Sequence, residues 1–224
     1  MPLSLVKFLF FILTITVALS AQAATATTNL TTTSNSTHNP ARTILVYGDS
    51  LSAGYGISAA QSWPALLGQR LQQDGSPWAV ANASISGETT AGGRSRFAGA
   101  LKQFRPAIVI LALGANDGLR GLPVKAMRDN LAAMIALARQ DKARVLLVGM
   151  RLPPNYGQDY TLSFEAAFRD LAKVEKLPLI PFLLEPIAAN SAAFQADNLH
   201  PLASAQPALL DHMMKGLKPL LESP

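Results

Sequence analysis

The sequence of 224 residues contains no cysteine, and this absence excludes several kinds of protein at once. No disulfide can stabilise the fold, and no lipidated cysteine can anchor the chain. A cysteine nucleophile and a thiolate metal site are excluded as well. The chain therefore depends on its hydrophobic core, and 49% hydrophobic residues over this length suit one domain rather than two large ones.

Dense basic tracts and nucleotide-binding motifs are also missing. The basic residues are scattered and have no aromatic residues interleaved with them, which argues against nucleic acid as a partner. Neither G-x-G-x-x-G nor G-x-x-x-x-G-K-[ST] occurs. We therefore expect no flavin, nucleotide or other cofactor, and no metal.

A hydrophobic run near the N-terminus predicts an export signal. Lys7 precedes an apolar segment from Phe8 to Leu19, and Ala21-Gln22-Ala23 fits a cleavage site between small residues. The segment is short for the roughly 20 residues of a membrane span. We therefore expect cleavage after Ala23, no stable membrane insertion afterwards, and export to the periplasm or medium of a Gram-negative bacterium. An uncleaved anchor is the alternative.

Residues 24–41 are mostly threonine, serine and asparagine, a composition that cannot offset the entropy of ordering. We interpret them as a flexible linker. The predicted organisation is a signal peptide over residues 1–23, the linker over 24–41 and one folded domain over 42–224.

From residue 42 onward, short β-branched runs alternate with longer amphipathic segments. The expected strands are 43–47, 78–84, 107–113, 143–150 and 177–182. The expected helices are 62–73 with Ser62 as its cap, 92–104, 123–140, 162–176 and 203–221. This alternation predicts an α/β domain, a three-layer α/β/α sandwich in which helices cover both faces of a parallel sheet.

Polar residues gather where the predicted strands end, which is where open α/β sheets bind their ligands. The segments concerned are GDS (48–50), NASISGETTAGG (82–93), GANDG (114–118) and ADNLHP (196–201). One such segment would be an ordinary turn or helix cap. Four at one edge of the sheet indicate an active site.

Ser50 is the candidate nucleophile, and a serine hydroxyl needs an adjacent base. Of the three histidines, His38 lies in the linker and His212 in the amphipathic final helix, so His200 is the better base. Asp197 lies three residues before His200 and can reach its Nδ1 atom. Capping of the local turn is the alternative role of this aspartate, and the two roles are compatible.

The negative charge of a tetrahedral intermediate requires hydrogen-bond donors. Gly87 allows close approach of a backbone N–H, Asn116 offers an uncharged amide, and the N–H of Ser50 is the third candidate. A simple turn-forming role for Asn116 is the alternative.

The blocks GDSLSAGYG, SISGET, GANDG and DNLHP, in this order, resemble the four sequence blocks of the GDSL, or SGNH, hydrolases. The chain is most similar to their exported bacterial thioesterase and lysophospholipase branch, over most of residues 43–221. The resemblance implies a flavodoxin-like five-stranded parallel sheet, no cofactor, and a broad preference for acyl esters. It implies the same residues for catalysis, with Ser50, Asp197 and His200 as the triad and Ser50, Gly87 and Asn116 as the oxyanion donors.

Two positions depart from the family pattern. Ala115 and Asn198 stand where glycine is usual, and asparagine tolerates a left-handed backbone better than most residues do. The nucleophile block GDSLS also lacks the second glycine of a G-x-S-x-G elbow, and the sole S-x-x-K lies in the signal segment. Other serine hydrolase classes are therefore not indicated.

We predict an exported, monomeric serine esterase that cleaves acyl esters and thioesters, including aryl esters, lysophospholipids and acyl-CoA. Its acyl groove is expected to include Leu119, Leu122 and Pro153, although these residues can equally pack their loops onto the rim. One rival is a carbohydrate acetyl esterase with the same four blocks. Another is a catalytically silent binding module, which the presence of both Ser50 and His200 disfavours.

Overall fold

The computed structural model describes residues 42–222. The expected signal peptide over residues 1–23 and the expected linker over residues 24–41 lie outside the described part, as do residues 223–224. Among the helices of residues 42–222, none is long and apolar enough to cross a membrane.

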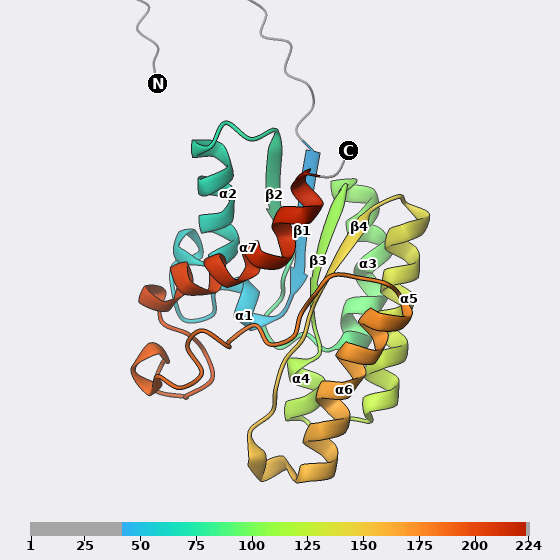
Figure 1. Ribbon diagram of the computed structural model, residues 1–224, viewed down its shortest axis with the longest axis vertical. Helices are drawn as coiled ribbons and strands as arrows, with labels where there is room; N and C mark the ends of the chain where they lie inside the picture. The colour runs from blue at the N-terminus through green and yellow to red at the C-terminus, as the bar shows by residue number, and fades with distance from the viewer. Residues whose placement is uncertain (1–41, 223–224) are drawn as a thin grey trace, which may run out of the picture. The chain divides into compact units, whose positions relative to one another are not determined.

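A five-stranded parallel sheet forms the centre of the domain, in the order β2-β1-β3-β4-β5. Figure 1 labels β2, β1, β3 and β4, which lie side by side in this order. The strands are β1 (Arg42–Gly48), β2 (Trp78–Asn82), β3 (Ile108–Ala112), β4 (Arg144–Val148) and β5 (Leu179–Ile180). The strand order reverses between β1 and β3, and such a switch point opens a crevice at the carboxyl ends of the strands. The expected flavodoxin-like α/β fold is confirmed.

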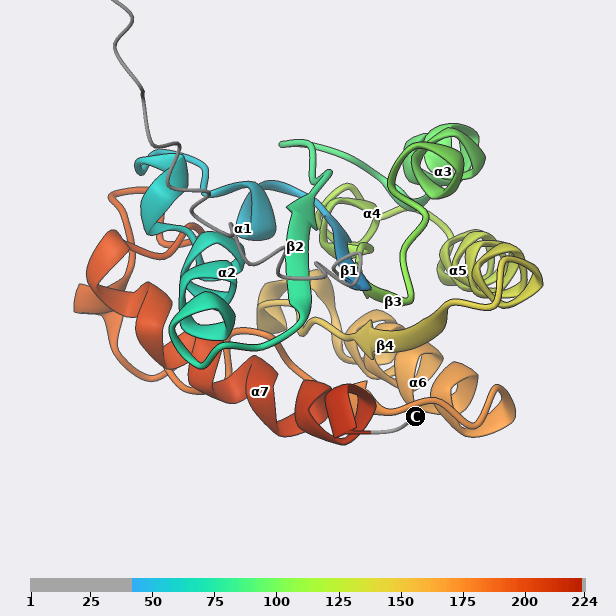
Figure 2. The same cartoon turned by 90° about the horizontal axis from the view of Figure 1, so that it is seen from above.

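Helices cover both faces of the sheet (Figure 2). One face carries α2 (Trp63–Gln73) and α7 (Gln206–Glu222), and the other carries α3 (Thr90–Phe104), α5 (Val124–Gln140) and α6 (Gln158–Val174). Two short helices that the sequence did not predict, α1 (Ser50–Ala53) and α4 (Ala115–Leu119), directly follow β1 and β3. Single 3₁₀ turns complete the chain at η1 (Ala59–Gln61), η2 (Pro154–Tyr156), η3 (Ser191–Ala193) and η4 (Ala203–Ala205).

The alternation of side chains along β1 divides the core into two layers. Ile44 and Val46 pack with α2 and α7, whereas Leu45 and Tyr47 pack with α3, α5 and α6. All four side chains are fully buried, as expected for a strand covered on both faces. The apolar stripe predicted for α5 is also buried throughout, at Met127, Leu131, Met134, Ile135 and Ala138.

The expected cap of α2 by the Ser62 side chain is wrong. The Ser62 hydroxyl donates to the carbonyl of Ala59 at 2.7 Å, whereas the N–H of Trp63 donates to Oε1 of Gln206 at 2.9 Å. Gln206 is the first residue of α7, so the cap comes from a residue 143 positions away. Only the packing of α7 beside α2 could supply it.

Two of the expected elements change most in their bounds. The strand expected over 177–182 is reduced to Leu179–Ile180, because Pro178 and Pro181 flank it and have no N–H to donate to a neighbouring strand. Helix α6 begins at Gln158 instead of residue 162. The chain turns at Gly157, whose φ of 89° favours glycine, and this turn lets the helix begin earlier.

Candidate active site

The end of β1 delivers Ser50 to the carboxyl edge of the sheet. Gly48 is closely packed there, since a Cβ atom on it would lie 2.8 Å from Oγ of Ser52 and 2.9 Å from the carbonyl oxygen of Ala112. Asp49 then caps α1, because its Oδ1 accepts from the N–H of Leu51 at 3.1 Å. Ser50 is therefore the first residue of a short helix directly after a buried strand.

The structure brings Ser50, His200 and Asp197 into one hydrogen-bonded chain. Nε2 of His200 lies 2.8 Å from Oγ of Ser50, across 150 residues of sequence. Nδ1 of the same ring lies 2.7 Å from Oδ2 of Asp197. These contacts are the ones that a nucleophile, a general base and an orienting carboxylate require.

The Asp197 carboxylate also holds the local turn. Its Oδ1 accepts from the N–H groups of Leu199 at 2.9 Å and His200 at 3.0 Å, so the capping role and the contact with the imidazole coexist. The hydrogen bonds from the N–H and the ring of His200, followed by that from Leu199, lower the pKa of Asp197 to about 2. Asn198, between them, has a φ of 55°, the left-handed conformation that asparagine tolerates.

Two of the candidate oxyanion residues, Gly87 in a loop and Asn116 in α4, lie in segments that contact each other. Gly87 has a φ of 78°, and its carbonyl accepts from Nη2 of Arg120 at 2.9 Å. Nδ2 of Asn116 donates to the carbonyl of Glu88 at 3.0 Å. Because a side-chain amide carries two N–H groups, Asn116 has one more to offer a ligand.

A buried pair that the sequence did not reveal ties these loops together. Asp117 accepts from the N–H of Thr90 at 2.8 Å and from its hydroxyl at 2.5 Å. Both residues are almost fully buried. Asp117 follows Asn116 in α4, and Thr90 begins α3 just after the Gly87 loop, so the pair sets the distance between the two candidate donors. Both residues belong to polar segments named in the sequence analysis, GANDG and NASISGETTAGG, but nothing in the sequence indicated that these two side chains would meet.

A cavity of about 280 Å³ opens at Ser50. The predicted residues Ser50, Gly87, Asn116, Leu119 and His200 all line it. Sequence reasoning missed Tyr55, Met150 and Leu199, which also line it. Tyr55 and Leu199 lie within the blocks GDSLSAGYG and DNLHP, but nothing in the sequence distinguished them from their neighbours there.

A second cavity, of about 350 Å³, adjoins the first because Leu119, Met150 and Leu199 line both. Pro153 lines this second cavity. Leu122 is 37% exposed and lines neither of the two. Two of the three residues expected for an acyl groove therefore lie along one apolar path that leads away from Ser50.

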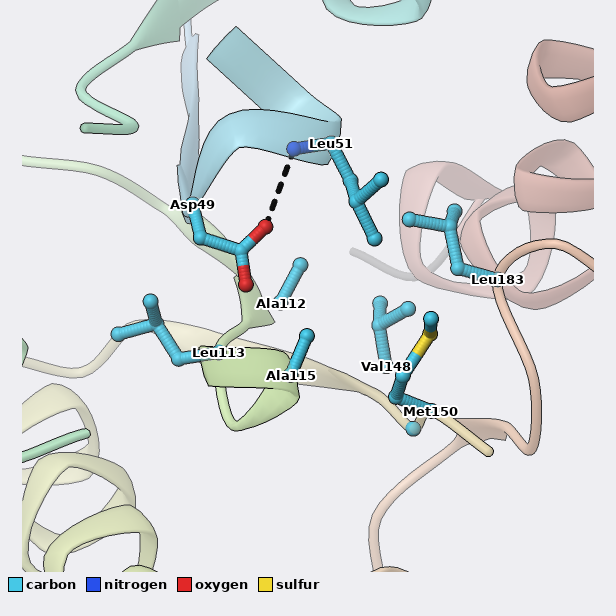
Figure 3. Close-up of a pocket in the computed structure, with 9 residues that line it drawn as sticks. Asp49, Leu51, Ala112, Leu113, Ala115, Val148, Met150 and Leu183 are labelled. Carbon is cyan, nitrogen blue, oxygen red and sulfur yellow. Dashed lines mark hydrogen bonds between the residues drawn. The ribbon is translucent and has the colours of Figure 1, made fainter. Parts of the chain in front are cut away.

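The buried carboxyl group of Asp49 lies next to the candidate site. Figure 3 shows Asp49 beside the apolar side chains of Ala112, Leu113 and Ala115, with its hydrogen bond from the N–H of Leu51. Burial raises the pKa of Asp49 to about 7, opposed by backbone N–H donors and reinforced by the negative charge of Asp117. Ala115, where the family pattern has glycine, contributes to these apolar surroundings.

The raised pKa of Asp49 predicts how stability depends on pH. Between about pH 4 and pH 7 the folded state keeps a proton that the unfolded state releases, so the free energy of unfolding falls as the pH rises through this window. Asp49→Asn binds no such proton and still offers an oxygen to the N–H of Leu51. The stability of this variant relative to the parent should therefore increase from about pH 4 to pH 7, by up to a few kcal/mol, and then level off. Urea unfolding across this range measures the difference, with the exposed Asp74→Asn as control, and a difference independent of pH would contradict it.

The chain is similar in sequence to known esterases and thioesterases. The model of the GDSL-like lipase/acylhydrolase family matches residues 46–206. Esterase TesA of Pseudomonas aeruginosa is 46% identical over 181 residues, covering 81% of this chain and 90% of that protein. The thioesterase 1/protease 1/lysophospholipase L1 of Escherichia coli K12 is 42% identical, covering 81% of this chain and 86% of that protein.

A solved structure has a similar fold. The psychrotrophic esterase EstA from Pseudoalteromonas, in a crystal structure inhibited by monoethylphosphonate, superposes with a TM-score of 0.78. It is 39% identical and the match covers 81% of this chain and all of that one.

Proposed function

Because this chain belongs to the GDSL-like lipase/acylhydrolase family, we propose that it is an exported serine esterase that cleaves acyl esters and thioesters. The observation that supports this most directly is the hydrogen-bonded series from Ser50 through His200 to Asp197 at the mouth of the cavity. The proposal includes export, a monomeric state, and aryl esters, lysophospholipids and acyl-CoA among the substrates.

In the proposed reaction, Nε2 of His200 takes the proton of the Ser50 hydroxyl as Oγ attacks the acyl carbon. Asp197 stabilises the imidazolium that forms and holds the ring with Nε2 facing Oγ. The intermediate collapses as the leaving group takes the proton from Nε2. Water then cleaves the acyl-enzyme by the same sequence, and the proton returns to Ser50.

The negative charge on the carbonyl oxygen would be met by the N–H groups of Ser50 and Gly87 and by Nδ2 of Asn116. A first-turn N–H of a helix has no partner within the helix, which suits the N–H of Ser50 for this role. The buried pair of Asp117 and Thr90 would keep the donors in place while charge develops, and such preorganisation is what makes an oxyanion site effective.

Acyl-chain length is the property that tests this proposal. With p-nitrophenyl esters from acetate to palmitate and the full chain as enzyme, kcat/KM should rise with chain length, because each added CH₂ can bury apolar surface along Leu119 and the second cavity. Leu119→Ser should lose about tenfold with the long chains and much less with acetate. Rates with each ester, parent against variant, measure both effects.

Activity confined to acetate would replace the proposal by an acetyl esterase acting on carbohydrate. An equal loss at every chain length in Leu119→Ser would mean that Leu119 packs its loop and does not contact the acyl chain. Leu122→Ser serves as the matched control, since Leu122 lies outside both cavities.

A further inference from the structure

Tyr55, in the block GDSLSAGYG, has no part in the reaction described above, yet its side chain lines the cavity at Ser50. It is 52% exposed, so about half of the side chain is accessible to a ligand in this cavity. An aromatic ring that lines a cavity can bury its apolar face against a bound ligand.

The backbone of Tyr55 is held from both sides. Its N–H donates to the carbonyl of Ser50 at 3.2 Å, and its carbonyl accepts from Nε2 of Gln195 at 2.7 Å. Gly54 and Gly56 have φ values of 78° and 74°, so the chain turns on both sides of the tyrosine. A Cβ atom on Gly56 would lie 2.1 Å from the amide oxygen of Gln195. The hydrogen bonds and close contacts of residues 54–56 therefore hold the backbone of Tyr55 in one position.

The ring of Tyr55 lies against the imidazole of His200. Their centroids are 4.5 Å apart and the planes are inclined by 41°. Gln195 also connects to the His200 loop, because its N–H donates to the carbonyl of His200 at 2.8 Å. The backbone of Tyr55 is thus hydrogen-bonded directly to Ser50 and, through Gln195, to the loop that carries His200.

Tyr55 lies where the leaving group has to depart in the proposed mechanism. In the proposed mechanism the bond from the acyl carbon to the leaving oxygen breaks, its electron pair stays on that oxygen, and the proton comes from Nε2 of His200. The leaving group must therefore lie beside His200, at the part of the cavity where the ring of Tyr55 contacts the imidazole. The acyl chain in the proposed mechanism extends along Leu119 into the second cavity, which Tyr55 does not line.

We propose that Tyr55 is a specificity-determining residue that forms an aromatic wall for the leaving group and favours esters of aromatic alcohols. The inference rests on the proposed function and deepens it by assigning the preference among leaving groups to one residue. A flat aryl ring can pack on the exposed part of Tyr55, whereas a small alkyl alcohol leaves it uncovered.

The test compares leaving groups on one acyl chain. Phenyl, cyclohexyl and ethyl hexanoate form the same hexanoyl-enzyme, so differences in kcat/KM reflect the leaving group. Tyr55→Ala should reduce kcat/KM about tenfold for the phenyl ester and less than about threefold for the ethyl ester, with the cyclohexyl ester between. Tyr55→Phe should remain near the parent with all three. Tyr55→Leu, which keeps apolar bulk without a ring, should still lose most with the phenyl ester.

Single-turnover hydrolysis of the hexanoyl-enzyme separates this role from mere support of His200. Deacylation should be unchanged in Tyr55→Ala, because the leaving group has already departed. Equal losses with all three esters, slowed deacylation, or no loss with any ester would overturn the inference. Leu162→Ala, at an exposed side chain of α6 outside the cavity, is the control. A parent enzyme that cleaves none of the esters would refute the proposed function itself, and this is seen before any variant is compared.

Discussion

Replacing Ser50 by alanine is expected to lower kcat for p-nitrophenyl hexanoate by about 10⁵- to 10⁶-fold, without unfolding the protein. The variant keeps the cavity, the base and the candidate oxyanion donors, but has no oxygen to form the acyl-enzyme. Ser50 is the first residue of α1 and alanine is a good helix former, so the local backbone should persist. Steady-state rates and a thermal melt of the same preparation measure the two expectations.

Ser52→Ala is the matched control. Ser52 lies two residues further along the same helix, is fully buried, and has an Oγ atom without a hydrogen-bond partner among the described residues. Removing this hydroxyl should change kcat by less than about threefold. Comparable losses in both variants would point to damage to α1 instead of loss of a nucleophile, and a Ser50→Ala enzyme as active as the parent would refute the assignment of the nucleophile.

Asp197→Asn should have the second largest effect, a loss in kcat of about 10⁴-fold. The asparagine can still accept the backbone N–H groups of Leu199 and His200 through its oxygen, so the turn should survive. Its NH₂ group would then face Nδ1 of His200, which favours the tautomer with the proton on Nε2 and leaves that atom unable to accept from Ser50.

The pH dependence distinguishes this explanation from a general loss of structure. The low pKa of Asp197, about 2, keeps the carboxylate of the parent ionised at every pH well above that value. The loss in Asp197→Asn should therefore persist throughout the range from pH 6 to pH 8, because the parent keeps its carboxylate ionised at each of these values. Asp211→Asn, which removes an exposed carboxylate paired with Arg70 on the surface, should stay within about twofold of the parent. A loss below tenfold in Asp197→Asn would mean that the carboxylate only caps its turn.

Several features of the site were predictable because their signals are local. Ser50 follows an apolar strand directly, and Asp197 precedes His200 by three residues, a spacing that a single turn closes. The choice of His200 over His212 needed only the amphipathic pattern of the final helix. His212 is in fact buried there, with Nε2 3.0 Å from the carbonyl of Phe182. The family assigned from the four blocks is confirmed by the match over residues 46–206.

Other features escaped prediction because their partners are distant in sequence. Three hydrogen bonds depend on where segments far apart in the sequence meet. They join Gln206 to the start of α2, Thr90 to Asp117, and Gln195 to Tyr55. A glutamine or threonine in a sequence carries no mark of such a partner. The missed short helices α1 and α4 have the same cause, since four or five residues are too few to show a helical period.

The sequence by itself determined the order of the five strands and the five long helices along the chain, the parallel sheet and the identity of the residues proposed for acyl transfer. These properties follow from hydrophobic periodicity and from residue chemistry, both of which depend on residue types and on residues close together in the sequence. The tertiary structure decided that Oγ of Ser50 meets Nε2 of His200 at 2.8 Å, that Leu119 rather than Leu122 lines the cavity, and that Tyr55 lies beside the base. Those outcomes depend on the packing of loops that end at one edge of the sheet, and a distance between loops is a property of the folded chain alone.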